Sequence, residues 1–103
     1  MKIVPTKQFI KDLKQIQRSS KVSIRNRIDT RLKEATALLS NGSTLPASFA
    51  DHELNDSRRY KDCRDCHILG DLVLIYKIED NNCILLLLRL DKHSNLFEGE
   101  LSC

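Results

Sequence analysis

Apolar residues change their spacing once along this chain, and that change limits the folds that it can adopt. Up to position 39 they recur every three or four residues, which is the spacing of one face of an α-helix. From position 52 onward they alternate or form short continuous runs, which is typical of β-strands. One switch within 103 residues, without a repeat or a linker, predicts a single α+β domain over residues 1–103.

Two helices are predicted before the switch. Ile3 and Val4 indicate a short first strand, and Thr6 is a suitable N-cap for a helix that runs to Gln17. After a break at residues 18–20, a second helix is predicted from Lys21 to the Asn-Gly pair at 41–42. The predicted apolar faces are Phe9, Ile10, Leu13 and Ile16 in the first helix and Val22, Ile28, Leu32, Ala35 and Leu39 in the second. The pair is expected to form an antiparallel hairpin.

Strands are predicted after a loop at residues 43–51. A short piece at 52–54 precedes three strands at 61–68, 72–78 and 83–90, with turn residues between them. Residues 91–97 are predicted to form a helical turn capped by Asp91. The predicted order is therefore β-α-α-β-β-β. It indicates a small, mainly antiparallel sheet with the helical hairpin packed on one face and the other face left open for a site.

Targeting signals and disulfides are not expected. The first residues lack the apolar core of a signal peptide, and the longest apolar run, residues 83–88, is far shorter than the roughly 20 residues of a membrane span. We therefore expect a cytoplasmic protein that has no membrane contact and keeps its four cysteines as thiols. Cys63 and Cys66 have the spacing of a zinc or redox pair, but residues three apart on a strand point to opposite faces, which favours ordinary packing.

Basic residues are concentrated at the start of the chain. Residues 1–33 hold ten lysines or arginines and two aspartates, whereas residues 34–103 hold seven basic and twelve acidic residues. This asymmetry is consistent with a polyanionic partner such as nucleic acid. Solvent-facing charged helices would give the same pattern, so composition alone leaves both interpretations open.

Three histidines, His52, His67 and His93, lie in or beside the predicted strands. RNA carries its own nucleophile, the ribose 2′-OH, so its cleavage needs only a base for that proton and an acid for the 5′-oxygen. Histidine suits both tasks because its ordinary pKa is near 6.5. Nearby acids are Asp51, Asp65 and Asp71, and nearby cations are Arg64, Arg89 and Lys92. The histidine spacings of 15 and 26 residues match no compact zinc motif, so no metal or other cofactor is expected.

Three segments of the second part of the chain carry a family resemblance. They are Leu45-Pro46 with Asp51-His52-x-Leu54; Arg64-Asp65-Cys66-His67-Ile68 with Asp71 and the strand after it; and Leu88-Arg89-Leu90-x-x-His93-Ser94-x-Leu96-Phe97. In this order they resemble the YafQ-type branch of the RelE superfamily over residues 45–97, and the helical part is similar only in pattern.

The resemblance implies a RelE-like toxin of a toxin–antitoxin system, a metal-free endoribonuclease that cuts mRNA on the ribosome. The residues that match catalytic positions are His52, His67, Asp71 and His93. Phe97 matches a residue expected to stack on an RNA base. The cations expected to contact RNA are Arg64, Arg89 and Lys92, of which the first two match the family. The implied partners are a cognate antitoxin, mRNA and ribosomal RNA, with operator DNA bound only through the antitoxin complex.

Some positions depart from the family pattern. Glu53 stands where the branch has proline. Tyr60 and Cys63 differ from the aromatic residues that the family has at these positions, and Asp91-Lys92 stands where the family has small residues. The turn after Leu54 is about two residues longer than in the family, which bears on loop geometry and codon preference.

Two other functions remain open at this stage. One is a ParE-like inhibitor of DNA gyrase that cuts nothing, and the other is a basic RNA-binding domain without catalysis. The set of three histidines favours the nuclease, because neither alternative needs them. Incidental placement explains any one histidine better than it explains all three.

Overall fold

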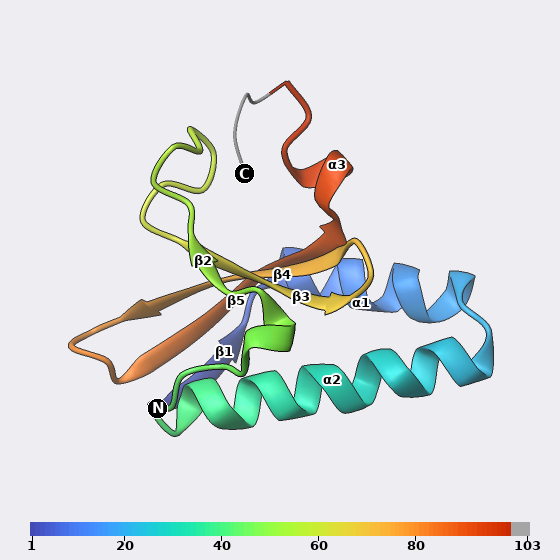
Figure 1. The fold of residues 1–103 in the computed structure, drawn as a ribbon, viewed down its shortest axis with the longest axis horizontal. Coiled ribbons are helices and arrows are strands. Elements are labelled where there is room, and N and C mark those ends of the chain that lie inside the picture. Colours follow the sequence, from blue (N-terminus) through green and yellow to red (C-terminus); the bar gives the residue numbers. More distant parts are fainter. Residues whose placement is uncertain (100–103) are drawn as a thin grey trace.

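The structure, a computed structural model, describes residues 1–99 and has the α+β class predicted from the sequence (Figure 1). Its elements, in chain order, are β1 (Lys2–Pro5), α1 (Lys7–Ser19), α2 (Val22–Ser40), the 3₁₀ helix η1 (Ala47–Phe49), β2 (His52–Glu53), β3 (Arg64–Leu69), β4 (Leu72–Glu79), β5 (Ile84–Lys92) and α3 (His93–Leu96).

The strands form one sheet in the order β1-β5-β4-β3-β2. β1 pairs with β5 in parallel, and the other neighbours are antiparallel, so the sheet is mixed but mainly antiparallel, as predicted. The α1–α2 hairpin and the later strands separate β1 from β5 in the sequence, which provides the long connection that a parallel pair needs. β4, which is apolar on both faces, lies in the centre.

The main core lies between the sheet and the helices. Figure 1 shows α1 and α2 on one side of the sheet. The helices contribute Phe9, Ile28, Leu32, Ala35 and Leu39, which pack against strand residues such as Leu74 and Leu85. Thr6 caps α1 as predicted, since its hydroxyl accepts a hydrogen bond from the Phe9 amide at 3.2 Å. Two residues depart from the predicted apolar faces: Ile10 of α1 is 39% exposed, and Val22, the first residue of α2, is 62% exposed.

The second face of the sheet is less open than predicted. The β2–β3 loop and α3 rise over it (Figure 1). A smaller apolar cluster fills the space beneath them: Leu54, Cys63, Val73, Ile75, Leu96 and Phe97. Alternation along β4 explains both cores, because Val73 and Ile75 face this cluster while Leu72 and Leu74 face the helices.

Two predicted boundaries near this cluster were wrong. β3 begins at Arg64 rather than at position 61, because the preceding residues turn and Asp62 adopts a left-handed backbone with φ of 68°. Asp91 does not cap α3. It belongs to β5, and its carboxylate accepts from the Lys92 amide at 2.7 Å and from the Asn95 side chain at 3.1 Å.

The cysteines fit the packing interpretation. Cys63 and Cys66 belong to the two different clusters, on opposite faces of the sheet, and both are free thiols, as is Cys83. The fourth, Cys103, lies outside the described residues. Burial raises the pKa of Cys66 to about 12, which makes its thiol a poor ligand and a poor nucleophile at neutral pH.

Within residues 1–99 no helix is both long enough and apolar enough to cross a membrane.

Candidate active site

Two of the three histidines lie beside each other on the second face of the sheet. The short strand β2 places His52 directly opposite Asp65 of β3. Directly opposed residues share a face, and so do residues two apart on one strand, which puts His67 on the same face as Asp65. The pairing of β2 with β3 therefore brings residues 52, 65 and 67 together.

The third histidine reaches this group from the end of β5. The His93 amide donates a 2.9 Å hydrogen bond to the carbonyl of Asp71, in the turn between β3 and β4. Its ring stacks on that of His67, with centroids 6.3 Å apart and planes 20° apart. The His93 ring also packs against the Phe97 ring, with centroids 4.6 Å apart. The structure thus brings the three predicted histidines into one site from three distant segments.

Asp65 occupies the centre of this group and was not among the residues predicted to be catalytic. Its side chain is fully buried, with Oδ1 2.7 Å from His52 Nδ1. That contact has the distance of an ion pair but not the angle of a hydrogen bond. Neither carboxylate oxygen of Asp65 therefore accepts a hydrogen bond from the described residues. Burial raises the pKa of Asp65, and the charges of His52, His67 and His93 partly oppose that rise. A sequence signal existed, because Asp65 precedes His67 by two residues on one strand face.

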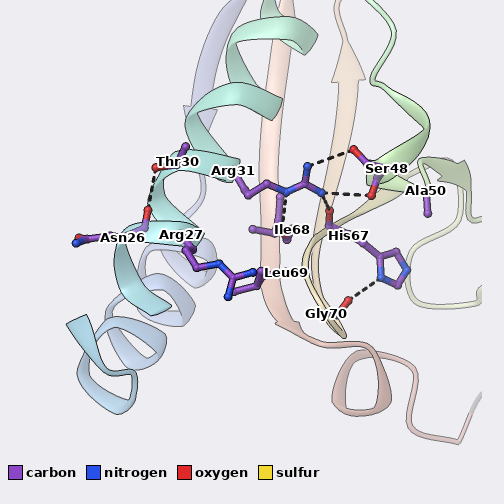
Figure 2. Close-up of a pocket in the computed structure, with 10 residues that line it drawn as sticks. All are labelled: Asn26, Arg27, Thr30, Arg31, Ser48, Ala50, His67, Ile68, Leu69 and Gly70. Atoms are coloured by element: carbon purple, nitrogen blue, oxygen red, sulfur yellow. Dashed lines mark hydrogen bonds between the residues drawn. The ribbon is translucent and has the colours of Figure 1, made fainter. Parts of the chain in front are cut away.

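Two of the imidazoles are oriented by main-chain carbonyls. His67 Nδ1 lies 3.1 Å from the Gly70 carbonyl (Figure 2), and His52 Nδ1 lies 3.3 Å from the Ala50 carbonyl. A carbonyl oxygen only accepts, so these contacts favour a proton on Nδ1 in each neutral ring. The opposite nitrogen, Nε2, then carries a lone pair that can take up a proton.

Asp71 joins the site through its main chain. Its carbonyl holds the His93 amide, whereas Asp71 itself is exposed and lines a cavity with Ser20, which connects α1 to α2, and with Ile24 of α2. Within residues 1–99 the Asp71 carboxylate makes no hydrogen bond or ion pair with the histidines.

Phe97 is 5% exposed. Its ring packs on His93 and makes an edge contact with Tyr60 at a centroid distance of 5.8 Å. In this conformation the ring has no free face for an RNA base, so the predicted stacking requires that α3 or the loop move.

Two of the three predicted RNA-binding cations are tied into the protein. Arg64 lies on the helix side of the sheet, where it pairs with Asp51 at 2.9 Å, and Tyr76 donates to the same carboxylate. The hydrogen bond to Asp51 raises the pKa of Arg64. Arg64 is therefore not brought together with the histidines.

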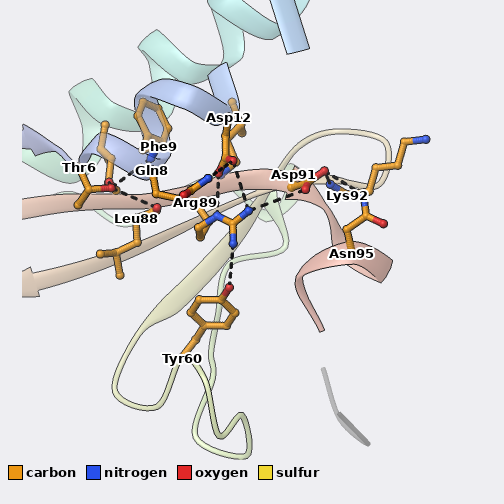
Figure 3. Close-up of polar contacts among 12 residues, drawn as sticks. Thr6, Gln8, Phe9, Asp12, Tyr60, Leu88, Arg89, Asp91, Lys92 and Asn95 are labelled. Atoms are coloured by element: carbon orange, nitrogen blue, oxygen red, sulfur yellow. Dashed lines mark hydrogen bonds and ion pairs between the residues drawn. The ribbon is translucent and has the colours of Figure 1, made fainter. Parts of the chain in front are cut away.

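Arg89 pairs with Asp12 of α1 at 2.8 Å and donates to the Tyr60 hydroxyl at 3.4 Å (Figure 3). The hydrogen bond to Asp12 raises the pKa of Arg89. Lys92 is exposed, and its side chain extends away from α3 (Figure 3).

A cavity of about 730 Å³ borders His67, between α2, η1 and the end of β3 (Figure 2). Its basic lining comes from Arg27 and Arg31 of α2. A cavity beside a titratable cluster is the usual form of a binding site for part of a substrate.

Comparison with known proteins identifies relatives along nearly the whole chain. A family model described as "Bacterial toxin of type II toxin-antitoxin system, YafQ" matches residues 1–98. A putative toxin YafQ from Haemophilus influenzae is 40% identical over 97 residues, covering 91% of this chain and 89% of that protein. An mRNA interferase toxin YafQ from Escherichia coli is 37% identical over 91 residues, covering 87% and 88%.

Solved structures are similar as well. YafQ from E. coli has a TM-score of 0.74 at 34% identity, covering 92% of this chain and 96% of that one. The E. coli DinJ–YafQ complex gives 0.71 at 36% identity, with the same coverage. A copper-bound mutant toxin from Helicobacter pylori gives 0.76 at 34% identity, covering 94% and 99%. A YoeB/ParE toxin from Agrobacterium tumefaciens, at 14% identity and a TM-score of 0.69, shares the fold alone.

Proposed function

This chain belongs to the YafQ family of toxins from bacterial type II toxin–antitoxin systems, and we propose that it is an endoribonuclease that cuts mRNA by acid–base catalysis. The observation that carries the proposal is the gathering of His52, His67 and His93 around the buried carboxylate of Asp65. The name of the E. coli relatives, mRNA interferase toxin, supports the same activity.

His67 and His93 are the proposed proton-transfer pair. The Nδ1 contact of His67 with Gly70 leaves Nε2 free to remove the proton of the ribose 2′-OH. The 2′-oxygen then attacks the adjacent phosphorus, and the bond to the 5′-oxygen breaks. Protonated His93, 6.3 Å from His67 between ring centroids, gives its proton to that 5′-oxygen. The products are a 2′,3′-cyclic phosphate and a 5′-hydroxyl, with no net change in protons.

Asp65 is proposed to act on the charges of the histidines rather than on RNA. A buried carboxylate stabilises an imidazolium nearby, and Asp65 interacts with all three rings. The protonated histidines can in turn stabilise the extra negative charge of the transition state, since Arg64 and Arg89 are engaged elsewhere. Lys92, exposed beside His93, is left to contact the RNA backbone.

Phe97 and Asp71 are proposed to support His93. The Phe97 ring packs against the imidazole, and the Asp71 carbonyl fixes the main chain where α3 begins. Both contacts limit how far the ring can move during proton transfer. A direct role of the Asp71 carboxylate would need RNA to reach its exposed side chain.

A metal is not part of the proposed mechanism. Two H. pylori toxin structures are described as copper-bound and metal-bound. Residues 1–99 of this chain contain no group of three or more histidine, cysteine or acidic side chains placed to hold a metal ion. The Nδ1 atoms of His52 and His67 also face carbonyls, which leaves one nitrogen on each ring.

An antitoxin is the proposed protein partner. The E. coli relative forms the DinJ–YafQ complex, and a cognate antitoxin that covers the histidines here would silence the nuclease. Operator DNA would be bound through that complex rather than by the toxin alone.

The nucleophile can be tested with an RNA whose sugar at the mapped cut site is 2′-deoxyribose. We expect cleavage at that site to stop and the unmodified RNA to yield a cyclic phosphate, because the 2′-OH forms the new bond. Both reactions are run with EDTA, which is expected to leave the rate unchanged. Cleavage of the deoxy substrate, or a 5′-phosphate product, would contradict the mechanism. A ParE-like inhibitor would cut neither RNA.

The basic helices are proposed to contact ribosomal RNA. Lys7, Lys11 and Lys14 form an exposed stripe on α1, and changing all three to glutamate should weaken co-sedimentation with ribosomes more than cleavage of free RNA. The glutamine triple variant serves as the control and should lose less binding, because it removes the charge without reversing it. An unchanged ribosome-bound fraction in the glutamate variant would contradict this role.

A further inference from the structure

β3 is irregular at the point that carries His67. Its register with β4 shifts between His67 and Leu69, which leaves one extra residue on β3. A bulge of this kind redirects a side chain and leaves part of the strand without its regular partners. On the other edge, β2 pairs with β3 only at Arg64 and Asp65. The main-chain carbonyls beyond Asp65 therefore need another donor.

Arg31 of α2 supplies that donor. Its Nε donates to the Ile68 carbonyl at 2.8 Å, and its Nη2 donates to the His67 carbonyl at 3.1 Å (Figure 2). The guanidinium thus holds the two peptide groups of the bulge that flank Ile68. The Gly70 carbonyl, which orients the His67 ring, lies only two residues further along.

The same guanidinium also holds the segment that leads to His52. Nη2 donates to the Ser48 carbonyl at 3.3 Å and Nη1 to the Ser48 hydroxyl at 3.4 Å. Its central carbon lies 3.7 Å from the centroid of the buried Phe49 ring. The next residue, Ala50, has a left-handed φ of 46°, and its carbonyl is the one that contacts His52 Nδ1.

We infer that Arg31 is a positioning residue of this nuclease, which holds the His67 bulge and the segment before His52 in one arrangement. The inference rests on the proposed function of the histidines. All three guanidinium nitrogens of Arg31 donate to protein acceptors, so its positive charge serves the fold of the site rather than a phosphate. Arg31 makes no hydrogen bond to the ring of His67 or of His52.

The alternative to a positioning role is that the cavity lined by Arg31 binds RNA. Arg27, one helical turn earlier, lines the same cavity and is exposed. If the charges of this cavity held an RNA strand, the loss of either arginine would mainly weaken RNA binding. A positioning role instead predicts slower chemistry, because misplacing a proton-transfer group by about 1 Å lowers the reaction rate roughly 100-fold.

The experiment compares the full-length protein with Arg31→Met, Arg31→Lys and Arg27→Met. Arg31→Met should lower kcat by about 10- to 100-fold with KM changed less than about threefold. Arg31→Lys should recover only part of that loss, because one ammonium group cannot bridge both segments. Nitrogen-15 NMR of the histidine rings, above pH 7.5, should show a single Nδ1–H tautomer for His67 in the wild type and a mixture in the Arg31 variants. Arg27→Met should leave that tautomer unchanged.

Arg31→Lys keeps the positive charge and the contact with Phe49. It therefore replaces Arg31→Met in the comparison if Arg31→Met does not fold. A single His67 tautomer in Arg31→Lys would overturn the positioning role. So would a rise in KM at constant kcat that Arg27→Met shares. A wild-type protein that cuts no RNA would refute the proposed function instead, and the NMR comparison would still show whether Arg31 orients His67.

Discussion

His93→Ala is expected to slow RNA cleavage by about 100- to 10,000-fold, the usual contribution of a proton-transfer group. Cells that express the variant without an antitoxin should therefore resume growth. The imidazole stacks on His67 and packs against Phe97, and we propose that it protonates the 5′-oxygen from there. Growth and single-turnover cleavage measure the effect.

Two matched variants separate chemistry from packing at this position. His93→Phe keeps an aromatic ring against Phe97 but has no proton to give, so it should be as inactive as the alanine variant. Ser94→Ala removes an exposed neighbour in α3 and should remain toxic. Undiminished toxicity of His93→Phe would remove His93 from the mechanism.

Asp65→Asn should make the protein more stable and the nuclease slower. The carboxylate is fully buried and accepts no hydrogen bond from the described residues, so replacing its charge should raise the free energy of unfolding by about 1–2 kcal/mol at pH 8. For a domain of this size each kcal/mol raises Tm by about 4–8 °C. Cleavage should fall by at least about tenfold, because the site loses the negative charge that interacts with all three histidines.

The pH dependence of that stability gain has a definite sign. Burial raises the pKa of Asp65, so the folded protein keeps this proton to a higher pH than the unfolded chain, whose aspartates titrate near pH 3.9. The stability contributed by protonated Asp65 is lost as the pH rises through the folded-state pKa. The advantage of Asp65→Asn should thus be small near pH 4 and grow toward pH 8.

Thermal unfolding of both proteins across this range measures the difference, with Asp56→Asn, an exposed aspartate, as the control. An Asp65→Asn variant that melts at or below the wild-type temperature at pH 8 would show that the ionised carboxylate is stabilised rather than strained. A stabilised variant with full activity would leave the histidines independent of Asp65.

Local sequence patterns were sufficient for the elements and for part of the site. The N-cap at Thr6, the two helices and the central strands follow from spacing and turn residues that act within a few positions of each other. Cys63 and Cys66 pack on opposite faces, as alternation predicted, although Cys63 directly precedes β3 rather than belonging to it. The resemblance of residues 45–97 pointed to the YafQ family, which the match over residues 1–98 confirms.

Partners that are distant in the sequence could not be read from it. Arg89 and Arg64 matched the family as possible RNA contacts, yet one pairs with Asp12, 77 residues away, and the other with Asp51. Phe97 was expected to stack on RNA, but the long β2–β3 loop and α3 bury it. Asp65 was noted only as a nearby acid, because its burial and its contact with His52 appear only once β2 has paired with β3.

The sequence by itself determined which segments are helix or strand and which residues have side chains able to move a proton, because both depend on residue type and short-range spacing. Only the tertiary structure decided that three histidines share one buried carboxylate and that Arg31 holds two of their segments. Those contacts join separate segments of the chain, and they exist only once the strands have paired and α2 has packed beside β3.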